Sequence, residues 1–132
     1  MPTAFPVQLV SPEAILFEGE AEMVVARAVS GSIAFLYGHV PYLGALDIAS
    51  LRIIFPGSGE QEAAVHGGFL QMTGDNLVVL SDLAELKDEI DVPRAQRAKA
   101  EAEQALSRDP EDAEAQAALK RADTRLEVAS SG

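Results

Sequence analysis

Cysteine and tryptophan are absent from this chain of 132 residues, and aromatic residues make up only 5% of it. Without cysteine, the chain can form no disulfide, no thiolate metal site and no cysteine nucleophile. The core must be filled mainly by Val, Ile, Leu and Ala, since these dominate the 48% of residues that are hydrophobic. A chain of this length supports one modest core, with at most a small appendage.

Long apolar runs are also missing. None approaches the roughly 20 residues that a helix needs to cross a bilayer. Residues 1–6 contain neither the basic region nor the apolar region of a signal peptide. We therefore expect an intracellular protein, soluble or peripheral, without direct bilayer insertion.

Basic residues are scarce in the first two thirds of the chain. Residues 1–89 contain three basic side chains against twelve acidic ones, whereas residues 90–132 contain seven against nine. The net charge of −11 argues against nucleic acid as a partner, because phosphate neutralisation needs clustered Lys and Arg. The basic C-terminal part could instead approach the acidic body, a nucleotide or an acidic protein surface.

No catalytic motif is present. The sequence contains no Gly-x-Ser-x-Gly elbow, P-loop or His-Glu-x-x-His motif. Its only histidines are His39 and His66. Two single histidines 27 positions apart are too little evidence to predict a metal site. Ser81 and Asp82 show no spacing that would link them to either histidine in a catalytic site. The sequence thus predicts a protein that is not an enzyme, with no catalytic residues, no metal and no required cofactor.

Up to about residue 87, short apolar runs alternate with glycine and proline. Residues 5–10 and 77–80 are typical strands, and Gly74-Asp75-Asn76 is a typical hairpin turn. The segment 37–44 contains two Gly and one Pro, which indicates a shaped loop. Short, regularly spaced strands of this kind predict a β-sandwich or flattened barrel.

The character of the chain changes at residues 90–95. Asp91 can act as an N-cap, and Pro93 fits the first turn of a helix. A helix is expected from about residue 92 to 107, because small and apolar residues recur at steps of three and four. This seam consists of Ala95, Ala98, Ala102 and Leu106.

A second helix is expected after a short break. Asp109 is expected as its N-cap and Pro110 as its first helical residue, with Ala129 near its end. Its seam consists of Ala115, Leu119, Ala122, Leu126 and Ala129. Two amphipathic helices joined by a short break predict an antiparallel hairpin.

The alanine-rich seam predicts a loosely docked arm. Each buried methyl-sized group contributes only about 0.8 kcal/mol, so the whole seam supplies a few kcal/mol. A ligand present at 100 times its dissociation constant supplies about 2.7 kcal/mol, which is comparable. We therefore interpret the two helices as an arm that a ligand or partner could move.

The order of several motifs resembles one known family. The motifs are Gly38-His39-Val40-Pro41-Tyr42-Leu43, Gly67-Gly68-Phe69-Leu70, Asn76-Leu77-Val78-Val79-Leu80-Ser81-Asp82 and Ile90-Asp91-x-x-Arg94-Ala95. In this order they resemble the epsilon subunit of the rotary, proton-translocating ATP synthase. The resemblance implies an N-terminal ten-stranded β-sandwich (flattened barrel) over residues 1–87. A C-terminal antiparallel two-helix hairpin would follow over residues 88–132 as a regulatory arm.

The resemblance also implies a function. A subunit of this kind is a non-catalytic part of the central stalk, or rotor, and its sandwich binds the gamma subunit and the ring of c subunits. Its helices, when extended, reach the catalytic alpha/beta head and slow ATP hydrolysis. We expect it at the cytoplasmic face of the cell membrane of a bacterium rather than in a plastid. The alternative is a stand-alone adaptor with the same architecture, which would not need to co-purify with gamma.

Seven residues match positions that bind regulatory ATP in such subunits. They are Glu85, Ile90, Asp91, Arg94, Ala95, Arg121 and Arg125. Arginine can hold phosphate oxygens in a planar fork. Glu101 stands where ATP-binding members have a basic residue, and it would repel phosphate. From spacing alone, residues 90–95 read equally well as a helix cap, and the two C-terminal arginines as a solvated face.

Four residues match the family's contact with the c ring. They are Gly31, Ser32, His39 and Tyr42. Ser32 replaces an acidic residue that is common in the family, and Ala34 and Tyr37 also depart from the usual pattern. Contact would then rest on hydrogen bonds and shape. From its Gly/Pro context alone, His39 reads as a loop histidine that holds neighbouring backbone groups.

Overall fold

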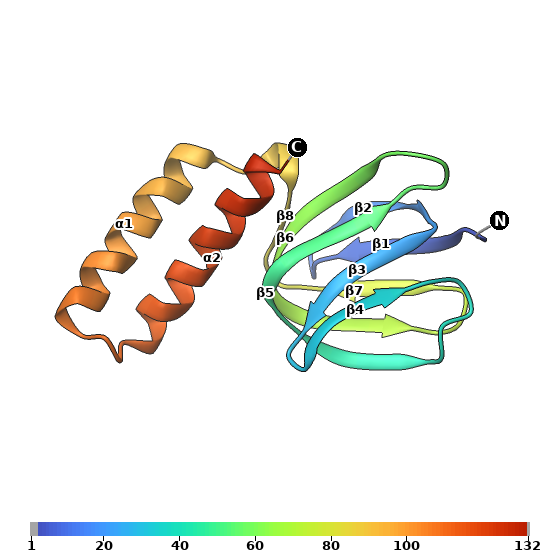
Figure 1. Ribbon diagram of the computed structural model, residues 1–132, viewed down its shortest axis with the longest axis horizontal. Helices are drawn as coiled ribbons and strands as arrows, with labels where there is room; N and C mark the ends of the chain where they lie inside the picture. Colours follow the sequence, from blue (N-terminus) through green and yellow to red (C-terminus); the bar gives the residue numbers. More distant parts are fainter. Residues whose placement is uncertain (1–2, 132) are drawn as a thin grey trace.

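The computed structural model describes residues 3–131, so residues 1, 2 and 132 of the expected domains lie outside it. Eight strands precede a short 3-10 turn and two helices (Figure 1). The strands are β1 (Phe5–Val10), β2 (Ile15–Ala21), β3 (Met23–Ala28), β4 (Gly31–Phe35), β5 (Tyr42–Ile54), β6 (Glu60–Met72), β7 (Leu77–Leu80) and β8 (Ala84–Leu86). The 3-10 turn is Lys87–Glu89, and the helices are α1 (Val92–Arg108) and α2 (Ala113–Ser130).

The strands form one sheet that folds over on itself. Its order is β2-β1-β7-β6-β5-β3-β4, with β8 paired to β6 outside this path. All pairs are antiparallel except β1 with β7, which is parallel. The predicted hairpin turn joins β6 to β7. The loop between β4 and β5 covers residues 36–41, so the prediction of a loop over 37–44 was wrong for residues 42–44, which begin β5 and pair with β6. The sandwich-like sheet followed by two helices confirms the fold class.

The described residues form eight strands where ten were expected, and the long strand β6 serves two parts of the sheet. It divides at Gly67 and Gly68, both of which have positive φ. Residues 63–65 pair with β8, and residues 69–72 pair with β7. A Cβ on Gly68 would lie 2.1 Å from the carbonyl oxygen of Leu80, so only glycine fits where the chain crosses its neighbour. One long strand therefore serves two parts of the sheet.

The core lies between the two layers of the folded sheet. Its fully buried side chains come from the inward positions of alternate residues, as the strand period requires. The largest are Phe5, Phe35, Leu9, Leu51, Ile53, Leu70, Met72 and Leu77. Every member of this cluster belongs to a strand, so the helices contribute nothing to it.

Helix α1 begins as predicted. The Asp91 carboxylate accepts a hydrogen bond from the backbone N–H of Arg94, and Pro93 lies in the first turn. Helix α2 begins later than predicted, because Asp112 is its N-cap and accepts from the N–H of Ala115. Asp109 instead holds the turn between the helices by accepting from the N–H of Glu111. The expectation of Asp109 as N-cap was therefore wrong.

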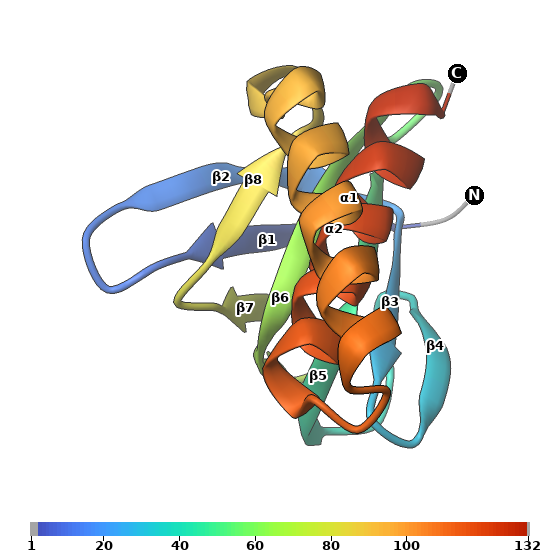
Figure 2. The ribbon, with the colours of Figure 1, turned by 90° about the vertical axis from the view of Figure 1, so that its left-hand side faces the viewer.

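Helix α2 lies between α1 and the sheet (Figure 1), and in the view from the side of the helices both lie in front of β5 and β6 (Figure 2). The predicted seam buries Ala95 and Ala102 of α1 and Ala115 and Ala122 of α2. Helix α2 also buries a second face, with Thr124 and Val128, which the seam does not include. This second face arises because α2 has neighbours on two sides and α1 packs mainly against α2.

Candidate functional site

The junction between the sandwich and the helices encloses a hollow of about 380 Å³. Strand β8 and the turn after it form one wall of this hollow. The first turns of α1 and the C-terminal part of α2 form the others. The lining residues are Leu83, Glu85, Glu89, Asp91, Arg94, Ala95, Ala98 and Arg125. Five of the seven residues expected at an ATP site thus meet around one hollow.

Glu85 is the central polar group of this junction. Its carboxylate accepts from Nε of Arg125 at 2.6 Å and lies 3.1 Å from Nε2 of His66. The His66 hydrogen bond and the Arg125 guanidinium lower the pKa of Glu85. His66 has only 2% of its side chain exposed, and its Nδ1 has no partner within the described residues. Sequence reasoning missed this partner of Glu85.

The other two expected residues lie apart from the hollow. Ile90 is half-buried but does not line it, and Arg121 pairs with Glu114 at 2.9 Å. Glu101 does not line it either. Three carboxylates and two guanidiniums line the hollow, and Arg125 is already engaged by Glu85. An anion in the hollow would compete with Glu85 for Arg125, whereas Arg94 forms no ion pair among residues 3–131.

Polar contacts hold α2 to the sandwich. Lys120 Nζ lies 2.7 Å from the carboxylate of Asp47 on β5, and this bond lowers the pKa of Asp47. The ammonium of Lys87 donates to the carbonyl oxygen of Ser131 at the end of α2. With the Glu85–Arg125 pair, these contacts fasten the middle and the C-terminal end of α2 to the sandwich, and Val128 is a buried apolar contact among them.

The four expected c-ring residues fall into two pairs. Gly31 and Ser32 begin β4, whereas His39 and Tyr42 follow its end. The rings of His39 and Tyr42 lie 4.9 and 5.5 Å from the ring of Phe35, and His39 Nδ1 lies 2.7 Å from the carbonyl oxygen of Val40. The two pairs are separated by the length of β4, roughly 13 Å.

Apolar side chains cross the outer face of the sheet. The strand pairing aligns Ala45 with Phe69, Phe69 with Leu80, Leu80 with Val10, and Val10 with Ile15. The N–H of Val29, directly after β3, donates to the carbonyl oxygen of Ala45. Val29 therefore continues this line of residues to the end of β3. We call this set the apolar row: Val29, Ala45, Phe69, Leu80, Val10 and Ile15. Phe69, Leu80 and Ile15 are each more than half exposed.

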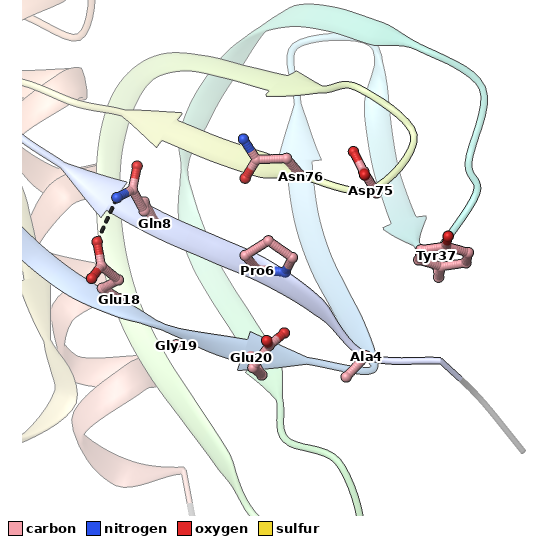
Figure 3. Close-up of a pocket in the computed structure, with 9 residues that line it drawn as sticks. All are labelled: Ala4, Pro6, Gln8, Glu18, Gly19, Glu20, Tyr37, Asp75 and Asn76. Atoms are coloured by element: carbon pink, nitrogen blue, oxygen red, sulfur yellow. Dashed lines mark hydrogen bonds between the residues drawn. The ribbon is translucent and has the colours of Figure 1, made fainter.

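A second, open hollow of about 860 Å³ lies on the same face, beside the start of β1 (Figure 3). Its lining is polar and acidic. It consists of Ala4, Pro6, Gln8, Glu18, Gly19, Glu20, Tyr37, Asp75 and Asn76. Gln8 donates to the carboxylate of Glu18 at 2.5 Å. We call this the acidic hollow.

Comparison with known proteins assigns the family. Residues 4–87 match the model of the ATP synthase delta/epsilon chain β-sandwich domain, and residues 88–130 match that of its long α-helix domain. The chain belongs to the ATP synthase delta/epsilon chain family. The ATP synthase epsilon chain of Streptomyces griseus is 45% identical over 120 residues, which are 91% of this chain and 90% of that one. The epsilon chain of Thermobifida fusca is also 45% identical, over 93% of this chain and 90% of its own length.

The fold agrees with this assignment. A chain in the structure of the Euglena gracilis mitochondrial ATP synthase superposes with a TM-score of 0.82 at 22% identity, over 98% of this chain and 82% of that one. Membership in the delta/epsilon family makes this a non-catalytic subunit of ATP synthase and leaves the stand-alone adaptor without support. Within the described residues, neither helix is long and apolar enough to span a membrane.

Proposed function

We propose that this delta/epsilon family member is a central-stalk subunit that couples c-ring rotation to the catalytic head. The sandwich, residues 1–87, would bind the gamma subunit and the c ring at the cytoplasmic face of the membrane. The arm, residues 88–132, would reach the alpha/beta head when extended and slow ATP hydrolysis. The observation that carries the assembly role is the apolar row, which the isolated chain leaves uncovered.

The apolar row is the face that we propose for gamma. It crosses five strands and continues to the end of β3, whereas large apolar patches are rare on soluble monomers. Large aromatic side chains near the middle of such a patch contribute most of the binding energy in protein interfaces. Phe69 has this central position, because it pairs with both Ala45 and Leu80.

Binding of Phe69→Ser to the gamma subunit of the same organism tests this face. We expect affinity to fall by at least about 30-fold, as for an interface hot spot worth about 2 kcal/mol. Val40→Ser is the matched control, because Val40 is 71% exposed but lies outside the apolar row. Unchanged gamma binding by Phe69→Ser would place gamma elsewhere.

For the c ring we propose the two ends of β4, with Gly31 and Ser32 at one end and His39 and Tyr42 at the other. Val40 at 71% and Tyr37 at 52% exposure add apolar surface beside His39. Retention of Ser32→Arg and His39→Ala variants on immobilised c ring with bound gamma tests this contact. Full retention of both variants would contradict it.

Regulatory ATP is a second candidate ligand, at the junction hollow. Glu85, Asp91, Arg94, Ala95 and Arg125 line it, and this convergence favours the proposal. The surplus of carboxylates there opposes it, so we expect weak binding. Calorimetry with ATP should show affinity that Arg94→Gln abolishes and that Glu89→Gln raises, because both residues line the hollow. Identical titrations for all three chains would exclude ATP from this hollow.

The inhibitory role of the arm is tested on the catalytic head. Head depleted of this subunit would receive either the full chain or a fragment ending at Glu89. We expect both to bind gamma and only the full chain to slow hydrolysis. Equal rates with both would make the arm passive and leave coupling as the function.

A further inference from the structure

The apolar row and the acidic hollow are neighbours on one sheet face. Val10 belongs to the row, and Gln8 and Pro6, two and four residues away on β1, line the hollow. Residues two apart on a strand point to the same side and lie roughly 7 Å apart. The pairing of Gln8 with Glu18 and of Pro6 with Glu20 carries this alignment onto β2. A partner that covers the row therefore reaches the hollow.

Within residues 3–131, no Lys or Arg side chain balances the carboxylates of this hollow. Strands β1, β2 and β7 contain no Lys or Arg, and none lines the hollow among the described residues. The three basic residues of the sandwich lie elsewhere. Arg52 pairs with Glu60, Lys87 bonds Ser131, and Arg27 lines a groove beneath α2.

The carboxylates also lack strong partners of their own. Glu18 accepts from the neutral amide of Gln8, and neither Glu20 nor Asp75 forms an ion pair within the described residues. Tyr37 and Asn76 add polar groups to the rim. The loops carrying Tyr37 and Asp75 are joined by the bond from Gly38 N–H to the Gly74 carbonyl. The acidic hollow therefore has a rim held by a hydrogen bond between two loops, and its lining side chains are negative or neutral.

We infer that this face is a single docking surface in two parts, and that its occupant is a gamma subunit with an apolar ridge and one or more Lys or Arg side chains beside it. The ridge covers the apolar row, and the basic side chain enters the acidic hollow roughly 7–13 Å away. This inference rests on the proposed assignment of the row to gamma. Charge complementarity of this kind fixes the orientation of docking and accelerates encounter.

The test is the association rate with purified gamma subunit from the same organism, using the full chain. The double variant Glu18→Lys/Glu20→Lys should lower the association rate constant about tenfold or more at low salt, and the difference should shrink at about 0.5 M salt. Glu103→Lys/Glu111→Lys on the arm is the control, because both residues are exposed and the net charge changes equally. We expect this control to have at most a small effect.

A conservative pair keeps the test decisive if the lysine variant misfolds. Glu18→Gln/Glu20→Gln should show a smaller loss in the same direction, with the same dependence on salt. No change in the association rate, or an equal change in the control, would overturn the inference. Slower binding to the c ring with unchanged binding to gamma would overturn it too, as would self-association of the free chain that only the hollow variants abolish.

The two proposals fail in different ways. If Phe69→Ser leaves gamma binding intact, the assignment of the row to gamma is wrong, and the inference falls with it. If Phe69→Ser abolishes binding while the hollow variants behave like the control, the row is correctly assigned and only the inference is wrong.

Discussion

At the scale of single residues, Glu85 links the sandwich to the arm. It lies on β8 and contacts His66 of β6 and Arg125 of α2, so three elements meet at one carboxylate. Both ends of the Glu85–Arg125 pair are at least three quarters buried. A hydrogen bond between charged groups in such surroundings contributes about 1.5–3 kcal/mol.

We predict that Glu85→Gln lowers the free energy of unfolding by about 1.5–2 kcal/mol at neutral pH. Glu114→Gln is the matched control, because Glu114 pairs with Arg121 but is 81% exposed. Its effect should stay within about 0.5 kcal/mol, as for surface pairs. Urea denaturation of the three chains measures both values, and equal losses would show that burial of the Glu85 pair adds nothing.

The loss should also depend on pH. The pKa of Glu85 is lowered in the folded chain from its ordinary value of 4.5, so the ionised form stabilises the fold. That contribution is complete above the ordinary pKa and disappears as the pH falls through the lowered one. The stability of Glu85→Gln should therefore converge with that of the unmodified chain only as the pH falls below 4.5 and through the lowered pKa. Parallel stability curves across this range would contradict the linkage.

At the scale of elements, the turn between the helices contains two competing caps. Asp109 and Asp112 both precede helical sequence, and Pro110 favours the earlier start. The chain uses Asp112, because Asp109 is occupied as the end of α1 and as the acceptor of the Glu111 N–H. The sequence signals favoured Asp109 as the cap and did not reveal that the turn engages it.

We predict that Asp112→Ala destabilises the arm by about 1 kcal/mol, since the N–H of Ala115 loses its acceptor. Asp109→Ala should cost less, because its bond to the Glu111 N–H lies in an exposed local turn. Amide hydrogen exchange in the first turn of α2 distinguishes the two variants. Faster exchange in Asp109→Ala than in Asp112→Ala would reverse the assignment of the cap.

Local patterns allowed the strands, the α1 cap and the alanine seam to be predicted, because each depends on neighbours in the sequence. The second face of α2 could not be predicted in this way, since Thr124 and Val128 are buried by strands distant in the chain. The same holds for His66 beside Glu85, which depends on the pairing of β6 with β8. Glu85, Arg94 and Arg125 were expected only through the family resemblance.

At the scale of the whole molecule, a sandwich with a hydrophobic core and an arm with little buried apolar surface are joined by polar contacts. The main hydrophobic cluster is built from the strands alone, whereas the arm docks through α2 with Lys120, Arg125 and one buried valine. The apolar row and the acidic hollow also belong to this scale. They follow from strand register across the sheet, which the alternation of apolar residues within one strand does not reveal.

We predict that a chain ending at Glu89 folds without the arm. It should unfold cooperatively and keep the strand content of the full chain, because no residue of the main cluster is removed. In the full chain, amides of α1 and α2 should exchange faster than those of β5 and β6. An unfolded fragment, or equal protection of arm and sheet, would show that the arm is an integral part of the fold.

The uncovered apolar row has a consequence for the cell that makes this chain. A newly synthesised copy presents the row to every other molecule until its partner arrives, and a folded sandwich cannot hide it by rearranging a packed interior. Surplus copies should therefore be the ones that adhere to chaperones or are degraded. We expect selection to favour matched production of the two subunits, for example from adjacent genes translated in fixed proportion.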